Sequence, residues 1–388
     1  MDATEKFFVL CVKKGIVGET VTETPKDVDY QKLYKLCHEH VMSVAVFLAL
    51  KEVFGELPVD FYQKLKKSAS YLIMHDERIR HDTEKVIDVL EKSGVKYMPL
   101  KGYYLKPLYF ESAMRYASDC DILIDVKELG KVREVLINLG LKIKKQDEHH
   151  DVFYFPESGS AFEIHKLLFV GGFEKYFGEG FYRAEPSEIK GGLYKLSDED
   201  FYMTLIAHTA YHFLHSAGFG LRHLTDLYLF RNSKSLNYEY LNSELKKIGL
   251  EKFNEELVKL INFFFEGGKS EEFTIKLAKH VLNSKVLENT EKKTATEIVL
   301  NSKSNDKSGA KRRTILRILF PKKKSMQFSY PVLKKAVFLL PVFYVVRWFE
   351  VLIFRPKNVK RLKRVKCVED REIFEVSEMH KSLGLDKI

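Results

Sequence analysis

Asp119 and Asp121 stand one residue apart at the start of an apolar run that continues through residue 124. Because successive side chains of a β-strand point to opposite faces, both carboxylates would point the same way. Two carboxylates on one face are costly to bury unless a cation neutralises them, and Mg²⁺, which shares its shell with substrate phosphates, is the usual hard cation. The spacing predicts a metal-dependent phosphoryl- or nucleotidyl-transfer site. The alternative is a strand whose first acid caps a turn and whose second acid faces solvent.

A third acid lies in the segment Phe162-Glu163-Ile164-His165, where apolar and polar residues alternate as in a strand. Glu163 would project beside the aspartate pair if its strand is adjacent to theirs. His165 shares the face of Glu163 by the two-residue period, so it could bind a nucleotide or polarise Glu163. The alternatives are an exposed glutamate on an alternating strand and a structural histidine near a strand end.

A glycine turn precedes the aspartates. Residues 95–100 have the pattern of a short strand, and Lys101 and Gly102 follow directly. A strand, this turn and a short helix would direct backbone N–H groups at a phosphate, with Gly102 allowing close approach and Lys101 adding a positive charge. An ordinary strand-to-helix turn also contains one glycine. Arg115 either reaches a phosphate with two N–H groups, steadies the acids, or is a surface arginine.

Two pairs of polar residues stand four apart in a later helical region. Arg222 and Asp226 have the spacing of an ion pair along one helix. His208 and His212 have the spacing of metal ligands, but no Glu-x-x-His context supports zinc. We therefore expect the two histidines to line the cleft from one helix face.

The elements that would position these residues follow from hydrophobic periodicity. Residues 94–196 alternate short strands with helices, which predicts a small mixed sheet with helices packed on it. Helical patterns occupy the flanking regions on both sides. The expected organisation is an N-terminal helical region, the sheet region, a second helical region, a polar linker or exposed loop, and a basic and apolar helical region, at residues 1–93, 94–196, 197–284, 285–311 and 312–388.

Positive charge is concentrated near the C-terminus. The formal net charge is +10, but residues 311–366 hold 17 Lys or Arg against one acid, Glu350, so the rest of the chain is slightly acidic. The four cysteines are far apart and lack CxxC spacing, which excludes a zinc or disulfide framework and fits a reducing compartment. Since the start of the chain lacks a basic secretory region, we expect a cytoplasmic protein.

Residues 336–354 form an apolar stretch flanked by lysines and arginines. Only Pro341, Arg347 and Glu350 interrupt it, and these argue against a simple membrane span. One interpretation is peripheral contact of residues 311–366 with the anionic inner face of a membrane. The other is a buried helical hairpin with Pro341 at its kink. Nucleic-acid binding is disfavoured, because the basic residues flank an apolar run and do not alternate with exposed aromatics.

These motifs together resemble the nucleotidyltransferase superfamily with the polymerase-beta-like fold. Within it, the chain is most similar to the bacterial "uncharacterised nucleotidyltransferase" group, whose members often sit among genes for cell-surface polysaccharides. The resemblance rests on residues 99–102, Leu105, Tyr109, Arg115, residues 118–124, residues 162–165, His208, His212, and residues 220–227, 320–321 and 330–354.

The resemblance implies an α+β fold: a small mixed β-sheet nucleotidyltransferase core with packed helices, N-terminal helices and a C-terminal helical domain. It implies a Mg²⁺-dependent enzyme, with Mn²⁺ as the other candidate ion, that moves a nucleoside monophosphate from an NTP to an unidentified hydroxyl or phosphate of a sugar, small molecule or protein. Asp119 and Asp121 would be metal ligands, and Glu163 the third ligand or the base. The nucleotide would contact Lys101, Gly102, Arg115, Ser118, His165 and Arg222.

The chain departs from the superfamily pattern at one position. Tyr103 follows Gly102, where the family usually has a serine or glycine that contacts a phosphate. This departure favours an alternative, in which the fold serves as a binding or scaffold module of a surface-polysaccharide system. The retention of all three acids favours the enzyme.

Overall fold

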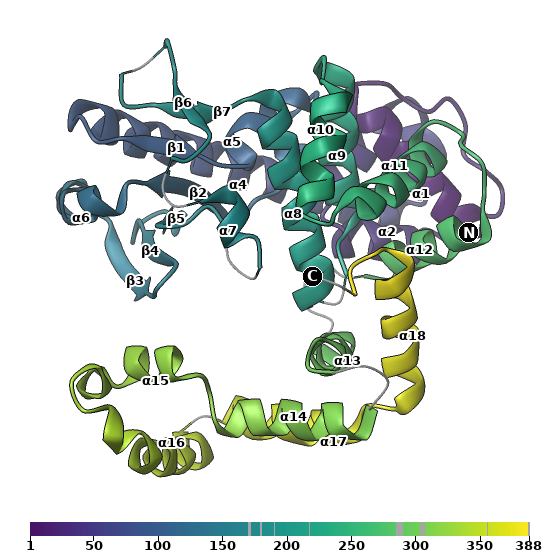
Figure 1. The fold of residues 1–388 in the computed structure, drawn as a ribbon. Coiled ribbons are helices and arrows are strands. Elements are labelled where there is room, and N and C mark those ends of the chain that lie inside the picture. Colours follow the sequence, from purple (N-terminus) through teal and green to yellow (C-terminus); the bar gives the residue numbers. More distant parts are fainter. Residues whose placement is uncertain are drawn as a thin grey trace. The chain divides into compact units, whose positions relative to one another are not determined.

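The computed structural model describes residues 1–169, 172–178, 181–189, 191–216, 218–284, 290–302, 307–354 and 356–386. The α+β class predicted from the sequence is confirmed, since helices accompany a small mixed sheet (Figure 1). The chain divides into two compact units. Residues 1–209 and 219–287 form the first unit, and residues 210–218 and 288–388 form the second.

The five-stranded sheet belongs to the first unit. Its strands have the spatial order β1-β2-β5-β4-β3; β2 pairs in parallel with β5, and the other neighbours are antiparallel. A smaller sheet pairs β6 with β7 in antiparallel fashion. The strands are β1 (Tyr97–Pro99), β2 (Asp119–Ile124), β3 (Lys142–Gln146), β4 (His150–Tyr154), β5 (Ala161–His165), β6 (Ala184–Pro186) and β7 (Tyr194–Leu196).

The alternation of side chains gives the large sheet one apolar face. Ile122 and Ile124 of β2 and Phe162 and Ile164 of β5 are fully buried in one cluster. The same cluster contains apolar side chains from α4 (Val59–Lys92) and α6 (Leu129–Asn138), so these two helices cover that face. The odd-numbered residues of β2 and β5 therefore point to the opposite face of the sheet.

The N-terminal helices begin with α1 (Ala3–Ile16), whose start is fixed by a reciprocal capping box between Asp2 and Glu5. Helices α2 (Tyr30–Glu39) and α3 (Ser43–Ala49) lead to α4. Short helical pieces accompany the sheet, namely η1 (Lys51–Glu56), α5 (Gly102–Leu105), η2 (Lys106–Leu108), η3 (Ser112–Met114), η4 (Val126–Glu128) and α7 (Glu174–Phe177).

The helical region after the sheet agrees closely with the periodicity of the sequence. It contains α8 (Asp198–Ser216), α9 (Leu221–Ser233), α10 (Tyr238–Lys247), α11 (Glu251–Phe265) and α12 (Glu272–Leu282). Helix α8 begins with three acids in its first turn, where they complement the helix dipole.

The second unit contains helices where a polar linker was expected. Helix α13 lies within residues 285–311, and its Ala295 and Ile298 are buried, so the linker interpretation is wrong there; residues 285–289 and 303–306 lie outside the described residues. Ala295 and Ile298 pack in one cluster with Val365 and Ile373. The elements are α13 (Thr290–Leu300), α14 (Lys307–Leu319), α15 (Lys323–Ser329), η5 (Pro331–Lys334), η6 (Val337–Leu339), α16 (Leu340–Phe354), α17 (Pro356–Cys367) and α18 (Asp370–Ser382).

Helix α16 corrects the buried-hairpin interpretation of residues 336–354. Val342 and Phe349 are 56% and 62% exposed, so an apolar face of the helix is open to solvent. Pro341 is the second residue of α16, and in the first turn of a helix a proline costs no hydrogen bond and causes no kink. Among the described residues, no helix is both long enough and apolar enough to cross a membrane.

Candidate active site

The three acids come from the two central strands of the sheet. In the parallel pairing of β2 with β5, Asp119 is opposite Ala161 and Asp121 is opposite Glu163. Asp119, Asp121 and Glu163 therefore share the sheet face that α4 and α6 leave open. The adjacency that the sequence interpretation required for Glu163 is present in the structure, and His165 follows on the same face.

Asp121 is the centre of this group. One of its carboxylate oxygens lies 3.0 Å from Nε2 of His165, and the other lies 3.1 Å from Nζ of Lys101. The same histidine nitrogen lies 3.5 Å from Glu163. Candidate ligand atoms of Asp121, Glu163 and His165 all lie within 4.8 Å of one another. The structure thus brings Lys101 and His165 to the acids.

The electrostatics of the site separate the two aspartates. Burial and the neighbouring charges of Asp121 and Glu163 raise the pKa of Asp119, although a hydrogen bond from Ser118 opposes this. Burial would also raise the pKa of Asp121, but the positive charge of Lys101 and the hydrogen bond from His165 hold it well below its usual range. Asp121 is therefore a fixed negative charge, and Asp119 experiences the repulsion of two carboxylates.

His165 and Glu163 stabilise each other's charged forms. The hydrogen bond from His165 is the main reason that the pKa of Glu163 is lowered. Burial would lower the pKa of His165, but its hydrogen bonds to Asp121 and Glu163 raise it. The imidazole and Lys101 thus place positive charge where the carboxylates converge.

The donor set fits a hard divalent cation. Three carboxylates on one sheet face supply the oxygen ligands that Mg²⁺ prefers. Burial is the main reason that the pKa of Asp119 is raised, and the charges of Asp121 and Glu163 add to it; a cation nearby would favour the ionised carboxylate. Asp121 and Glu163, together with His165, form a group whose ligand atoms are close enough to hold an ion, whereas Asp119 shares their sheet face but lies outside that group.

The turn after β1 has an unusual backbone at Lys101, with φ +36° and ψ −92°. A non-glycine residue rarely adopts a positive φ, and such strain persists only where surrounding contacts enforce it. Here the side chain ends in the ion pair with Asp121. Sequence reasoning assigned Lys101 to a phosphate and missed this contact with a carboxylate.

Gly102 makes room for an arginine. A Cβ atom built on Gly102 would lie 2.9 Å from Nη1 of Arg115. The guanidinium of Arg115 therefore lies directly against the turn that was expected to approach a phosphate. The space that a side chain at position 102 would need is occupied by the guanidinium of Arg115.

Arg115 is held by an acid from α9. Its Nε and Nη2 donate hydrogen bonds of 2.8 and 3.0 Å to the two carboxylate oxygens of Asp226, and both residues are buried. The hydroxyl of Tyr109 donates a further hydrogen bond of 2.8 Å to Asp226. Arg115 is thus no surface arginine.

Arg222 has a different partner from the one expected. Its Nη1 donates a 2.7 Å hydrogen bond to the backbone carbonyl of Tyr116, two residues before Ser118. The expected ion pair along α9 is replaced by the Arg115–Asp226 pair. Burial and the charge of Arg115 lower the pKa of Arg222. Helix α9 thus braces the loop that leads into β2 through both Arg222 and Asp226.

Replacing Gly102 with Ala is expected to lower the free energy of unfolding by about 1 to 3 kcal/mol, because the new methyl group would overlap Arg115. The guanidinium cannot simply swing away, since two of its nitrogens are bonded to buried Asp226. Urea denaturation measures the change. Gly55→Ala is the matched control, because a Cβ there meets nothing within 4 Å. Equal stability of the Gly102 variant and wild type would show that Arg115 does not need this space.

Comparison with known proteins gives one match. A family model described as "Uncharacterised nucleotidyltransferase" matches residues 26–266, which is more than half of the chain and includes the whole site described above. No curated protein matches the chain, and no solved structure does.

Proposed function

Because the chain belongs to the uncharacterised nucleotidyltransferase family, we propose that it transfers a nucleoside monophosphate from an NTP to an acceptor with the help of Mg²⁺. The observation that carries this proposal is the placement of Asp119, Asp121 and Glu163 on one face of two adjacent strands. The acceptor is a hydroxyl or phosphate group of a sugar, a small molecule or a protein. The resemblance seen in the sequence implies a surface-polysaccharide context, so we propose a sugar-containing acceptor as the first class to test.

In the proposed reaction, an acceptor oxygen attacks the α-phosphorus of the NTP. The new oxygen–phosphorus bond forms as the bond to the β-phosphate breaks, so pyrophosphate leaves and the acceptor loses one proton. A divalent ion held by the three acids would supply charge neutralisation at the phosphates and lower the pKa of the acceptor hydroxyl. Glu163 serves either as the third ligand or as the base that takes the proton.

The positive groups around the acids have separate proposed roles. Lys101, whose Nζ lies 3.1 Å from Asp121, would contact the triphosphate while balancing the carboxylate. His165 holds Asp121 and Glu163 in place through its hydrogen bonds. Gly102 and Ser118 would offer backbone or hydroxyl groups to the nucleotide. Because Arg115 and Arg222 are engaged with Asp226 and Tyr116, we propose that both shape the site and add to its positive potential.

A thermal-shift experiment tests nucleotide binding. The full chain is heated with each of the four NTPs, with and without Mg²⁺, and its melting temperature is compared with that of Asp119→Ala/Asp121→Ala. We expect one NTP to raise the melting temperature only when Mg²⁺ is present, since a ligand that binds the native state alone stabilises it. The double variant should lose this increase.

Asp88→Asn is the control variant, because Asp88 is an exposed acid on α4 that pairs with Lys92. It should respond to the nucleotide as wild type does. If none of the NTPs shifts the melting temperature of wild type, the transferase proposal fails and the alternative of a scaffold module is favoured.

We also propose that the second unit contacts an anionic membrane surface through α16. Phe338, Val342, Val345, Val346 and Phe349, called here the apolar stripe, are 80%, 56%, 44%, 40% and 62% exposed. Phe338 lies in η6, directly before α16, and the positions of the other four follow the three- and four-residue spacing of one face of α16. Such a stripe, several hundred Å² when contiguous, is unusual on the surface of a soluble monomer.

Three half-buried side chains of α16, Tyr344, Trp348 and Glu350, are held by hydrogen bonds to other parts of the second unit. Trp348 Nε1 donates a 2.8 Å hydrogen bond to the carbonyl of Leu319, and Tyr344 donates one of 2.8 Å to the carbonyl of Pro321. Glu350 accepts a hydrogen bond from Tyr330. The basic side chains nearby suit anionic headgroups; those that are exposed include Lys322, Lys323, Lys324, Lys334 and Lys335, whereas Arg355 lies outside the described residues.

Co-sedimentation with vesicles tests the membrane proposal. We expect Phe338→Ser/Phe349→Ser to bind vesicles of mixed neutral and anionic lipid at least about tenfold more weakly than wild type, because burial of each Phe contributes about 1.5 to 3 kcal/mol. Met74→Ser, at a 73% exposed position on α4, is the control. Equal binding by the stripe variant and wild type, or no binding by wild type, would contradict the proposal.

A further inference from the structure

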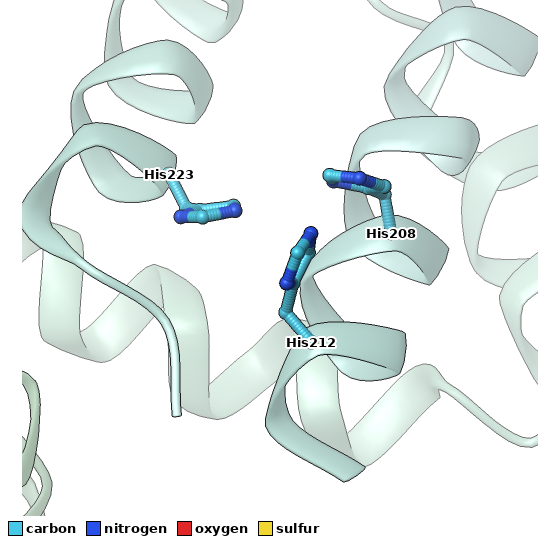
Figure 2. Close-up of side chains that lie close together, drawn as sticks. All are labelled: His208, His212 and His223. Atoms are coloured by element: carbon cyan, nitrogen blue, oxygen red, sulfur yellow. The ribbon is translucent and has the colours of Figure 1, made fainter. Parts of the chain in front are cut away.

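Three histidines from α8 and α9 converge in a group distinct from the carboxylates of β2 and β5. His208 and His212 follow each other by one turn of α8, and His223 faces them from α9 (Figure 2). The rings of His208 and His223 stack with centroids 5.8 Å apart and an interplanar angle of 25°. One ring nitrogen from each of the three residues lies within 4.8 Å of the others.

The three imidazoles of this cluster favour a different kind of metal ion than the carboxylates of β2 and β5 do. Imidazole nitrogens suit Zn²⁺ and related transition metals, whereas carboxylates and waters suit Mg²⁺. In a tetrahedral site with Zn–N distances near 2.0 to 2.1 Å, ligand nitrogens are about 3.4 Å apart. The ligand nitrogens of the three histidines already lie within 4.8 Å of one another, so binding would require the group to contract.

The surroundings favour a defined site. His223 is buried, whereas His208 and His212 are half-buried, so the cluster lies at the edge of the packed interior. The ring of Phe219 lies edge-on to that of His223, with centroids 6.0 Å apart, and gives the cluster an apolar wall. Apolar surroundings strengthen the attraction between a cation and its ligands.

We propose that His208, His212 and His223 form a metal site for Zn²⁺ or a chemically similar divalent transition-metal ion, separate from the carboxylates proposed to hold Mg²⁺. Three histidines leave a fourth coordination position for water or another ligand. The ion would tie α8 to α9. This matters for the rest of the molecule because α9 also carries Arg222 and Asp226, which brace the loop before β2.

Cobalt titration tests the site without any assay of activity. The full chain is stripped of metal with a chelator and titrated with Co²⁺, whose visible absorption reports its coordination geometry, and Zn²⁺ is then added as a competitor. We expect one equivalent of Co²⁺ to give the absorption of a tetrahedral site, and Zn²⁺ to abolish it. His212→Gln and His223→Gln should weaken binding at least about 100-fold, more than the loss typical of outer-shell changes.

Two controls separate this site from other sources of binding. His38→Gln, at an exposed position on α2, should bind as wild type does. Asp121→Asn should also keep the cobalt absorption, because its carboxylate belongs to the other group. Loss of the absorption in Asp121→Asn with retention in the histidine variants would place the ion at the carboxylates and overturn the proposal.

A further variant guards against loss of folding as the explanation. His212→Cys replaces the imidazole by a thiolate, which is also a strong ligand for Zn²⁺ and Co²⁺. We expect this variant to bind cobalt and to gain a sulfur-to-cobalt charge-transfer band, which only direct coordination produces. Failure of wild type to bind Co²⁺ or Zn²⁺ stoichiometrically, or absence of that band in a folded His212→Cys protein, would refute the site.

Discussion

Replacing Asp226 with Asn is expected to lower the free energy of unfolding by about 3 to 5 kcal/mol, because it leaves the buried guanidinium of Arg115 without a counter-charge. Arg115 and Asp226 are 5% and 6% exposed, so water cannot replace the lost carboxylate. The hydroxyl of Tyr109 also loses a charged acceptor. Since a typical domain has a stability of about 5 to 15 kcal/mol, this change removes a large share of it. Urea denaturation followed by circular dichroism measures the effect.

A double variant distinguishes an ion pair that stabilises the fold from one that is merely costly to break. In Arg115→Met/Asp226→Leu both charges are removed together, and apolar replacements of a buried pair are often neutral or stabilising. We expect this variant to recover most of the lost stability. Glu84→Gln is the control, since Glu84 and Arg80 form a solvent-exposed ion pair, and such pairs contribute little to stability. A change below about 1 kcal/mol in Asp226→Asn would contradict the expectation.

The sheet face that carries the acids could be predicted because it depends only on local periodicity. The two-residue period of a strand places Asp121 and Glu163 opposite the fully buried Ile122 and Ile164. In β2 the pattern ends in an apolar run, and Leu123, on the face of Asp121, is buried as well. A shift of one residue would expose Ile122 and Ile164, so the orientation of the acids is strongly determined. The pairing of β2 with β5 then brings the acids together.

The partners of the arginines could not be predicted, because they depend on contacts between distant parts of the chain. Sequence spacing pairs Arg222 with Asp226, but such a pair on a helix surface contributes only about 0.2 to 0.5 kcal/mol. Arg115 lies 111 residues before Asp226 in the chain, and its burial demands a counter-charge. The cost of burying Arg115 without a counter-charge exceeds the small gain from a pair along the helix, so Asp226 pairs with Arg115. The positive φ of Lys101 has no signal in the sequence either, because glycine is the residue usually found there.

The polar composition of residues 285–311 led to the incorrect prediction of a linker, because the contacts that hold α13 also come from distant parts of the chain. Residues 290–300 are polar overall, yet Ala295 and Ile298 face the cluster that also holds Val365. A few small apolar residues suffice to anchor a helix when its partners come from elsewhere in the chain. Conversely, the apolar run at 336–354 is too hydrophobic to reveal which face is covered. The hydrogen bonds of Tyr344 and Trp348 decide that, and they lie outside any periodic pattern.

Replacing Asp121 with Asn is expected to reduce metal-dependent nucleotidyl transfer at least about 100-fold, because the variant removes the carboxylate that is most firmly ionised in the site. Metal coordination contributes several kcal/mol to the stabilisation of transition-state charge, and each 1.4 kcal/mol corresponds to about a tenfold change in rate. The measurement is Mg²⁺-dependent release of pyrophosphate from the NTP identified by thermal shift, in the presence of candidate acceptors.

The fold should survive this substitution, which makes the loss of activity informative. Asn has the size of Asp and keeps a carbonyl oxygen that can accept a hydrogen bond from His165. The side chain of Lys101 is 29% exposed, so water can solvate its charge once the carboxylate is gone. Circular dichroism and a cooperative melting transition verify folding, and Asp88→Asn should retain full activity. Wild-type turnover in a folded Asp121→Asn protein would contradict the proposed metal-binding role of this residue, because an amide oxygen carries no charge to balance that of the ion.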